Sequence, residues 1–205
     1  MADLPRQSLV TIDPAAWPQI VAGQDQDILK DWAARGWPAI VRRPTCGDMG
    51  DAIPIGVPLP PSHGKARIAL TASSDAILSC APPPLLRDAA GSAPLAWQAT
   101  IAVLLIARPS LRCYGSLAWQ HLTGLPYISE TSDLDILAEC GDAAEADELA
   151  AALAAIAPTA CPKLDGELVA PDGAAVQWRE WAGEEPMVLV KARDARLAHR
   201  EHVFA

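Results

Sequence analysis

The chain has 205 residues, 51% of them hydrophobic, and a formal net charge of −9. This length suits one ordinary domain or two small ones. The hydrophobic content is high enough to form a buried core, which argues against a disordered chain. The acidic balance argues against broad nucleic-acid binding, and the longest apolar run, residues 95–107, is too short to span a membrane. An anionic ligand would therefore need a local basic patch or metal ions.

Residues 1–14 include acidic side chains and no apolar segment, so they do not resemble a secretory signal, and a cytoplasmic protein is expected. The cysteines are odd in number, widely spaced and without a Cys-x-x-Cys pair, which argues against a disulfide framework or a zinc site. Reduced and mostly buried thiols are therefore predicted for Cys46, Cys80, Cys113, Cys140 and Cys161. The histidines likewise have no metal-ligand spacing.

Residues 1–84 are rich in proline and predict a smaller N-terminal α+β domain, a candidate for binding the substrate or a carrier protein. Residues 25–36 predict a helix that ends at a glycine, and residues 37–43 predict a short strand. Residues 65–73 predict a second strand, and the proline and glycine content of residues 56–64 predicts a loop. The side chains expected to be buried are Ile28, Leu29, Trp32, Ala66, Ile68 and Leu70.

A proline-rich linker, residues 81–94, separates this part from a second domain, residues 85–205. From there the pattern predicts alternating helices and strands, hence an α/β (α+β) fold around a mixed sheet. The predicted helices cover residues 95–107, 116–123 and 142–156, and the first of them is expected to be buried. The predicted strands cover residues 112–115, 133–139, 163–170, 174–182 and, as the last, 187–193.

Two local signals support these assignments. Asp142 can cap the helix that follows it, because Glu145 stands three residues further on. The same helix has a stripe of apolar side chains formed by Leu149, Leu153 and Ile156. Residues 171–173, Pro-Asp-Gly, predict a hairpin turn between the third and fourth strands of this domain.

Asp133 and Asp135 form the most informative pair in the chain. Residues two apart on a strand point to the same face, so both carboxylates are expected to lie side by side. Two close carboxylates repel each other unless a cation neutralises them, and magnesium suits a shell of carboxylates and phosphates. Gly115 and Ser116, at a strand-to-helix turn, would let a phosphate approach backbone N–H donors. Together these residues predict phosphoryl or nucleotidyl transfer.

The order of Gly115-Ser116, Asp133-Leu134-Asp135, a helix and further strands resembles the polymerase-beta-like nucleotidyltransferase superfamily. More closely, the stretch YGSLAWQHLTGLPYISETSDLDIL, residues 114–137, is similar to the malonate decarboxylase holo-acyl-carrier-protein synthases, which are phosphoribosyl-dephospho-CoA transferases. Residues 164–191 and, less specifically, residues 37–43 resemble the same family. The likeness therefore covers most of the chain.

This resemblance implies that Asp133 and Asp135 are catalytic and bind Mg²⁺ together with the donor phosphates, and that Ser116 holds the leaving pyrophosphate. The implied reaction moves phosphoribosyl-dephospho-CoA from triphosphoribosyl-dephospho-CoA to a serine of the apo acyl-carrier subunit of malonate decarboxylase. A carrier of citrate lyase would present the same chemistry, which leaves the acceptor open.

The superfamily usually adds a third acidic residue from a later strand. Asp165 and Glu167 are the favoured candidates for this metal-binding role, and Glu180, on the strand expected next, is the third; a solvated surface position is the alternative for each. The cations that would bind phosphates, with ordinary surface charge as the alternative, are Arg42, Arg43, Lys65, Arg67 and Lys191.

Two other interpretations of the same residues stay open. The first is another metal-dependent nucleotidyltransferase that acts on a protein or small-molecule hydroxyl; it shares the chemistry and differs only in the family-like stretch. The second is a non-catalytic nucleotide-binding module, which the intact Gly-Ser pair and both aspartates disfavour.

Overall fold

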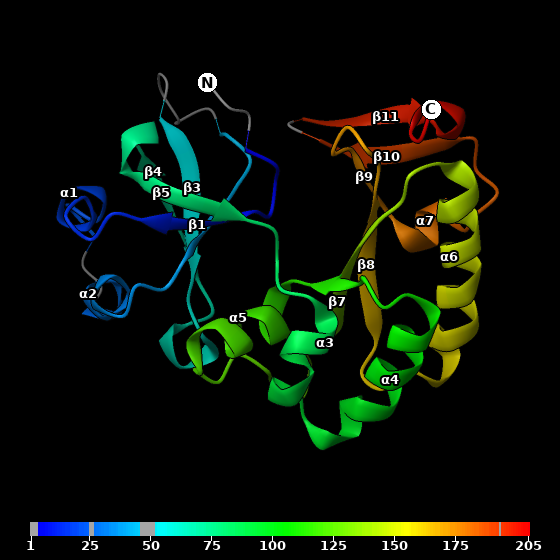
Figure 1. Ribbon diagram of the computed structural model, residues 1–205, viewed down its shortest axis with the longest axis horizontal. Helices are drawn as coiled ribbons and strands as arrows, with labels where there is room; N and C mark the ends of the chain where they lie inside the picture. Colours follow the sequence, from blue (N-terminus) through cyan, green and yellow to red (C-terminus); the bar gives the residue numbers. More distant parts are fainter. Residues whose placement is uncertain (1–3, 25–26, 46–51, 193) are drawn as a thin grey trace. The chain divides into compact units, whose positions relative to one another are not determined.

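The computed structural model describes residues 4–24, 27–45, 52–192 and 194–205 (Figure 1). The chain divides into two compact units, residues 1–83 (unit 1) and residues 84–205 (unit 2). Each unit has its own sheet, so the fold is α+β, as the sequence predicts. Within the described ranges, no helix combines the length and the apolar character that crossing a membrane requires.

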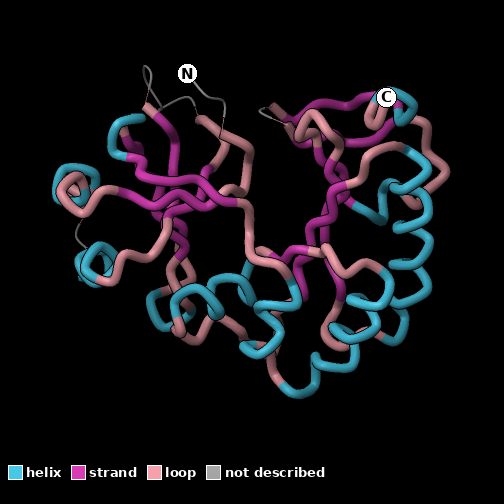
Figure 2. The backbone as a smooth tube through the Cα atoms, in the orientation of Figure 1, coloured by secondary structure: helices cyan, strands magenta, loops and turns pink. Residues whose placement is uncertain are grey.

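Unit 1 is built on a five-stranded sheet with the strand order β4-β3-β2-β1-β5, in which every pairing is antiparallel. Figure 2 shows these strands gathered in one sheet with helices beside it. The strands are β1 (Leu9–Ile12), β2 (Ala39–Val41), β3 (Ile53–Pro58), β4 (Arg67–Ala72) and β5 (Ile77–Ala81). The helices are α1 (Trp17–Ile20) and α2 (Asp27–Ala34).

The predicted helix of unit 1 is confirmed as α2, with its buried face as expected; residues 25 and 26 lie outside the described residues. In β4, Ile68 and Leu70 are buried, but the prediction for Ala66 was wrong, because this residue is exposed. The strand begins one residue later, and the Ala66 carbonyl instead accepts a hydrogen bond from the backbone N–H of Leu59 (2.7 Å).

The loop predicted for residues 56–64 was wrong in its first part, because β3 continues to Pro58. Pro54 and Pro58 make β3 hard to recognise in the sequence, because proline has no N–H group to donate to a neighbouring strand. The carbonyl group of Pro54 still takes part, by accepting a hydrogen bond from the N–H of Arg42 (3.1 Å). Strands β1 and β5 were also missed, because both are too short to show a clear period.

Unit 2 is built on a six-stranded sheet with the strand order β11-β10-β9-β8-β7-β6, in which only β7 and β8 run parallel. The strands are β6 (Arg112–Cys113), β7 (Leu134–Glu139), β8 (Leu164–Val169), β9 (Ala175–Gln177), β10 (Met187–Lys191) and β11 (Ala195–His199). The helices are α3 (Leu86–Ala89), α4 (Gln98–Ala107), α5 (Gly115–Thr123), α6 (Ala143–Ile156) and α7 (Trp178–Trp181). The mixed sheet that the sequence predicts is confirmed.

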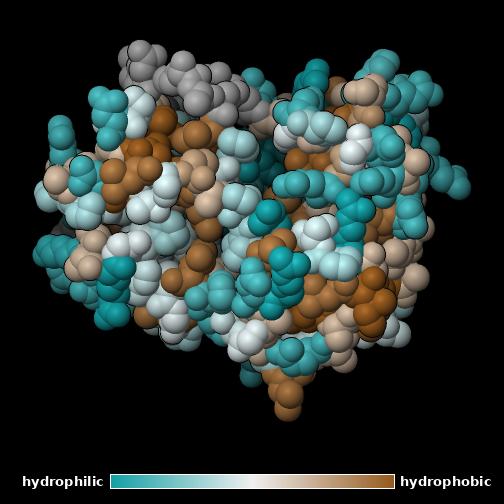
Figure 3. All heavy atoms as spheres, viewed as in Figure 1, coloured by the Kyte–Doolittle hydropathy of each residue, from teal (hydrophilic) through white to brown (hydrophobic). Residues whose placement is uncertain are grey.

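Three expectations for unit 2 need correction. The strand predicted for residues 174–182 ends at Gln177, whose side-chain oxygen accepts hydrogen bonds from the backbone N–H groups of Arg179 and Glu180 and caps the start of α7. Glu180 therefore lies on a helix and not on a strand. Strand β10 is not the last, because β11 pairs with it along its whole length; residue 193 lies outside the described residues. Helix α4 is buried on one face only, and Figure 3 shows hydrophobic atoms exposed over it.

The sheet of unit 2 has two chemically different faces. The face that carries Leu134, Ile136, Leu168 and Val188 packs in the main hydrophobic core together with side chains of α4, α5, α6 and α7. Side chains alternate between faces along a strand, so the residues between these positions point the other way. We call this second side the carboxylate face, because Asp135, Asp165 and Glu167 lie on it.

Candidate active site

The turn from β6 into α5 places Gly115 directly against Asp135. The backbone N–H of Tyr114 donates to the carbonyl group of Asp135 (3.1 Å), which ties the turn to β7. Gly115 has φ +63°, and a Cβ atom added to it would lie only 1.9 Å from Oδ2 of Asp135. Glycine is therefore required twice here, for its backbone conformation and for the space that the carboxylate occupies. Ser116 follows in the first turn of α5 and is partly exposed.

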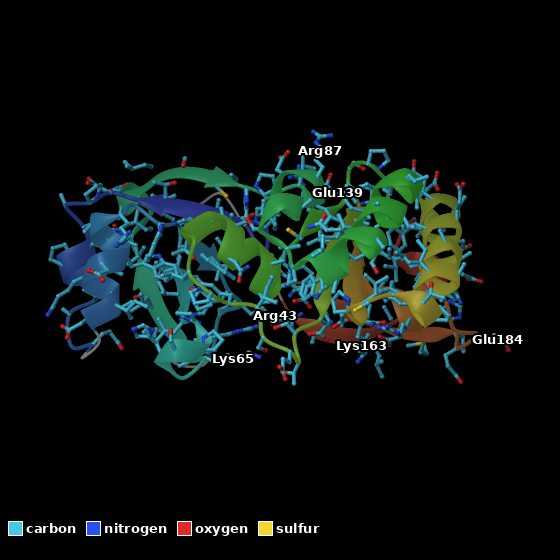
Figure 4. The ribbon with its side chains drawn as sticks, turned by 90° about the horizontal axis from the view of Figure 1, so that it is seen from below. Arg43, Lys65, Arg87, Glu139, Lys163 and Glu184 are labelled. Atoms are coloured by element: carbon cyan, nitrogen blue, oxygen red, sulfur yellow. The ribbon has the colours of Figure 1, made fainter. Side chains whose placement is uncertain are left out.

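Asp135 is the second residue of β7 and Asp133 directly precedes the strand; both are partly exposed. The parallel register pairs Asp135 with Asp165 of β8, so a third carboxylate stands beside the pair on the same face. The backbone N–H of Leu134 donates to the carbonyl group of Lys163 (2.9 Å), which fixes this end of the register. In Figure 4, the labels of Lys163 and Glu139 mark the two ends of the parallel pair.

Asp165 is held by a set of hydrogen bonds. Its Oδ1 accepts from the backbone N–H of Gly166 and from the Gln177 side-chain amide, both at 2.9 Å. The Arg179 guanidinium lies 3.7 Å from the same oxygen and stacks over the ring of Trp178. These contacts fix the orientation of the Asp165 carboxylate, and the nearby positive charge partly neutralises it.

Glu167 and Lys191 form an ion pair across the carboxylate face. The Lys191 ammonium donates to Oε1 of Glu167 at 2.9 Å. The Glu167 side chain is only 5% exposed and that of Lys191 is 27% exposed, so the carboxylate has little contact with water and the ammonium group compensates part of its burial. Of the two candidates for a third metal ligand, Asp165 is therefore nearer to solvent than Glu167.

The predicted phosphate-binding arginines belong to unit 1. The Arg42 guanidinium donates to the carbonyl groups of Ile55, Arg43 and Leu70, and thereby ties β3 to β4. Arg43 is partly exposed, and its Nε is buried without a hydrogen-bond partner among the described residues. Figure 4 shows Arg43 and Lys65 on this unit. Their role in phosphate binding stays a prediction.

The thiol nearest to the site is unsuited to nucleophilic chemistry. Cys113 is fully buried in β6, and burial raises the pKa of its thiol to about 12. Burial likewise raises the pKa of Cys140 to about 11. The prediction of mostly buried thiols holds for these two residues, whereas Cys80 and Cys161 are exposed and Cys46 lies outside the described residues. A catalytic role for either of these two buried thiols is therefore disfavoured.

The carboxylate pair fits a magnesium ion that is shared with a phosphate ligand. The Asp135 carboxylate occupies the space left by Gly115, Asp133 lies two residues before it, directly ahead of β7, and both are partly exposed. Among the described residues, no group of three or more His, Cys, Asp or Glu side chains is arranged to hold a metal by itself. Magnesium commonly binds one or two protein carboxylates and completes its shell with substrate phosphates and water, which matches this donor set.

Sequence reasoning missed three residues at this site. Gln177 and Arg179 hold Asp165 in place. Lys163 is exposed directly before β8, at the end of the sheet where β7 and β8 begin. The hairpin signal at residues 171–173 would have placed Gln177 across from Glu167, given the correct register. Arg179 was hidden because its segment was taken for a strand.

Comparisons with known proteins identify the family of the chain. Residues 5–83 match the family model "phosphoribosyl-dephospho-CoA transferase MdcG N-terminal domain", and residues 85–201 match the corresponding C-terminal domain. A phosphoribosyl-dephospho-CoA transferase of Bradyrhizobium diazoefficiens is 41% identical over 207 residues, which cover 97% of this chain and 91% of the relative. A transferase of the same name from Xanthomonas campestris pv. campestris (strain 8004) is 37% identical, covering 99% of this chain and 92% of the relative.

A third relative with this name, from Xanthomonas euvesicatoria pv. vesicatoria, is 38% identical and covers 97% of this chain and 96% of its own length. No solved structure matched the chain. Both family domains are present in order, and they account for almost the whole sequence. The chain is therefore an enzyme that belongs to the MdcG family of phosphoribosyl-dephospho-CoA transferases.

Proposed function

We propose that this transferase moves 2′-(5″-phosphoribosyl)-3′-dephospho-CoA from its 5″-triphosphate donor to a serine of the apo acyl-carrier subunit of malonate decarboxylase. The observation that carries the proposal is the packing of Gly115 against Asp135, which aims a carboxylate beside the N-terminus of α5. Family membership supports the phosphoribosyl-dephospho-CoA group as the unit transferred. The cysteine pattern of the sequence supports a cytoplasmic setting.

In the proposed reaction, the serine hydroxyl oxygen of the carrier attacks the α-phosphorus of the donor. The new serine O–P bond forms as the bond between the α-phosphorus and its bridging oxygen to the β-phosphorus breaks, and pyrophosphate leaves. Asp135 or Asp133 accepts the serine proton, as a carboxylate within reach of the attacking oxygen can do. Ser116 and the first N–H groups of α5 bind the leaving pyrophosphate, because a helix N-terminus favours negative charge.

Magnesium completes this proposal, with Asp133 and Asp135 as its protein ligands and Asp165 beside them. Once bound, the ion would neutralise the donor phosphates and lower the repulsion between the two carboxylates. Lys163, exposed at the same edge of the sheet, and Lys191 would supply positive charge to the remaining phosphate oxygens. In this proposal the lysines and the metal bind the phosphates, and one of the two aspartates accepts the proton.

The test compares donors and acceptors. Purified enzyme with Mg²⁺ is given triphosphoribosyl-dephospho-CoA, ATP or CTP, together with the apo carrier subunit or its serine-to-alanine variant. The proposal predicts labelling of the wild-type carrier by triphosphoribosyl-dephospho-CoA alone. Labelling by ATP or CTP instead would favour another nucleotidyltransferase. No labelling by any donor, with nucleotide binding preserved, would favour a non-catalytic module. An apo carrier of citrate lyase, run in parallel, distinguishes the two acceptors.

A further inference from the structure

The carboxylate face ends in an exposed apolar strip on β10 and β11. Leu189 and Leu197 are direct partners across this antiparallel pair, and Met187 lies on the same face opposite His199. The exposed fractions are 37% for Leu189, 67% for Leu197 and 44% for Met187. Neighbouring side chains of the same strands, such as Val188 and Val190, are fully buried on the other face. The strip is therefore the outward continuation of the face that carries the aspartates.

The strip lies at a defined distance from the aspartates. Strands β7, β8, β9, β10 and β11 are consecutive neighbours in the sheet. With a spacing of about 4.8 Å between strands, β10 and β11 stand about 14 Å and 19 Å from Asp135. The Glu167–Lys191 ion pair lies between, with its ammonium group supplied by the same strand as Leu189. The face thus presents, in order, carboxylates, a cation and an apolar strip.

The donor of the proposed reaction has its groups in the same order. Its reacting triphosphate stands at one end, followed by a ribose and adenosine, then a diphosphate, then the pantetheine arm with its methylene and geminal methyl groups. With the triphosphate at Asp133 and Asp135, the diphosphate falls near Lys191 and the arm falls beyond it. An apolar strip at that distance suits an extended chain of alkyl groups and amides.

From this match, and resting on the proposed function, we propose that Leu189, Leu197 and Met187 bind the pantetheine arm of the donor. The strip makes the enzyme select dephospho-CoA derivatives over nucleotides that lack the arm. Its role is separate from the chemistry of transfer, because none of its side chains reaches the carboxylates. The affinity for the adenosine and its phosphates should therefore not depend on the strip.

The experiment measures binding by calorimetry with two probes, dephospho-CoA and ADP, which differ by the arm. Wild-type enzyme is expected to bind dephospho-CoA more tightly than ADP. Leu189→Ser and Leu197→Ser are each expected to weaken dephospho-CoA binding about tenfold, as the loss of a half-exposed leucine contact implies, and to leave ADP binding unchanged. Leu197→Met should retain the wild-type preference, because it keeps an apolar side chain of similar volume.

Ile106→Ser on α4 serves as the matched control. It removes an equally apolar and more exposed side chain, 83% exposed, from an element that has no part in the carboxylate face, and neither probe should bind differently. Unchanged dephospho-CoA binding in both leucine variants would overturn the proposal, as would an equal loss for both probes. Slower transfer to the carrier with intact dephospho-CoA binding would assign the strip to carrier docking instead.

A wild-type enzyme without preference for dephospho-CoA would also overturn the proposal. The transfer assay, run on the same samples, then separates the two failures. Transfer that proceeds normally leaves the proposed function standing and removes only the strip's role. Absence of transfer by the wild-type enzyme removes both.

Discussion

Gly115 lacks the one side-chain atom that would occupy the place of the Asp135 carboxylate. Its φ of +63° also lies in a backbone region that residues with a Cβ atom rarely adopt. Sequence reasoning identified the Gly-Ser pair and both aspartates, but assigned the glycine to phosphate approach. The structure adds a second reason, close contact with the Asp135 carboxylate, which no pattern in the sequence reveals because the two residues are far apart in the chain.

Replacing Gly115 by alanine should therefore inactivate the enzyme beyond its effect on stability. The added Cβ displaces the Asp135 carboxylate, and a displacement of about 1 Å in a catalytic group can cost about a hundredfold in rate. Gly124→Ala is the control, because Gly124 has a similar φ of +72° but open space around its Cβ position. Both variants should lose about 1 kcal/mol of stability. Equal transfer rates in the two variants would contradict the contact described here.

The thiols should differ sharply in reactivity. At pH 8 in the native state, iodoacetamide should label the exposed Cys80 and Cys161, and leave the buried Cys113 and Cys140 unlabelled until the chain is unfolded. Peptide mass spectrometry after a timed pulse measures this. Rapid labelling of Cys113 in folded protein would show that β6 is open to solvent.

The buried Cys113 thiol should make the stability of the protein fall as the pH rises into the alkaline range. Burial raises its pKa from about 9 to about 12, so the folded state keeps the thiol neutral while the unfolded state ionises. Its contribution is therefore complete below pH 9 and declines as the pH rises from 9 toward 12. Urea unfolding of Cys113→Ala should show a smaller decline over this range than the wild type. An identical decline in both proteins would assign the effect to other groups.

At the scale of elements, the parallel pair β7 and β8 organises the site. Its register sets Asp165 beside Asp135, and the next strands bring Gln177 and Lys191 to the same face. Helix α6 is also locally determined: Asp142 accepts from the N–H of Glu145 (2.9 Å), as its sequence predicts. The Gly141 N–H and then Arg108 hold the pKa of the Glu145 carboxyl below its usual value, which favours charge at this helix start.

The ion pair between Glu167 and Lys191 should contribute strongly to stability. Lys191→Met removes the ammonium group that bonds a buried carboxylate, and the expected loss is about 3 kcal/mol of unfolding free energy. The double variant Lys191→Met with Glu167→Met should regain most of this loss, because the buried carboxylate is removed together with the ammonium group. Urea unfolding of the three proteins measures the effect. A single variant as stable as the wild type would mean that water reaches Glu167.

The sequence was informative wherever a local signal decided the structure. The N-cap of α6 and the turn of the β8–β9 hairpin were predicted, as was the buried face of α2. It failed where long-range pairing decides, and also at one local cap that was not recognised. Residues 178–182 have the aromatic composition of a strand, but the Gln177 side chain turns them into α7. Strand β11 and the proline-bearing β3 exist because neighbouring strands pair with them, which periodicity alone does not show.

At the scale of the whole molecule, each unit has its own sheet, and the described residues of the main core of unit 2 all lie between Leu86 and Phe204. A core of this kind should not depend on residues 1–83. Residues 84–205 expressed alone are therefore expected to unfold cooperatively on heating, as circular dichroism would show. A fragment without a cooperative transition would mean that unit 1 is needed for unit 2 to fold.

One measurement tests the proposed role of the carboxylate pair, Asp133 and Asp135, most directly. Apo carrier subunit, Mg²⁺ and triphosphoribosyl-dephospho-CoA are incubated with wild-type enzyme, Asp135→Asn or the surface control Asp31→Asn, and the carrier's intact mass and the released pyrophosphate are measured together. With the wild type and the control, each carrier should gain one phosphoribosyl-dephospho-CoA, and one pyrophosphate should be released per carrier. With Asp135→Asn, the rate should be at least a hundredfold lower although that protein is folded. Full-rate transfer by Asp135→Asn would contradict a catalytic role of the carboxylate pair.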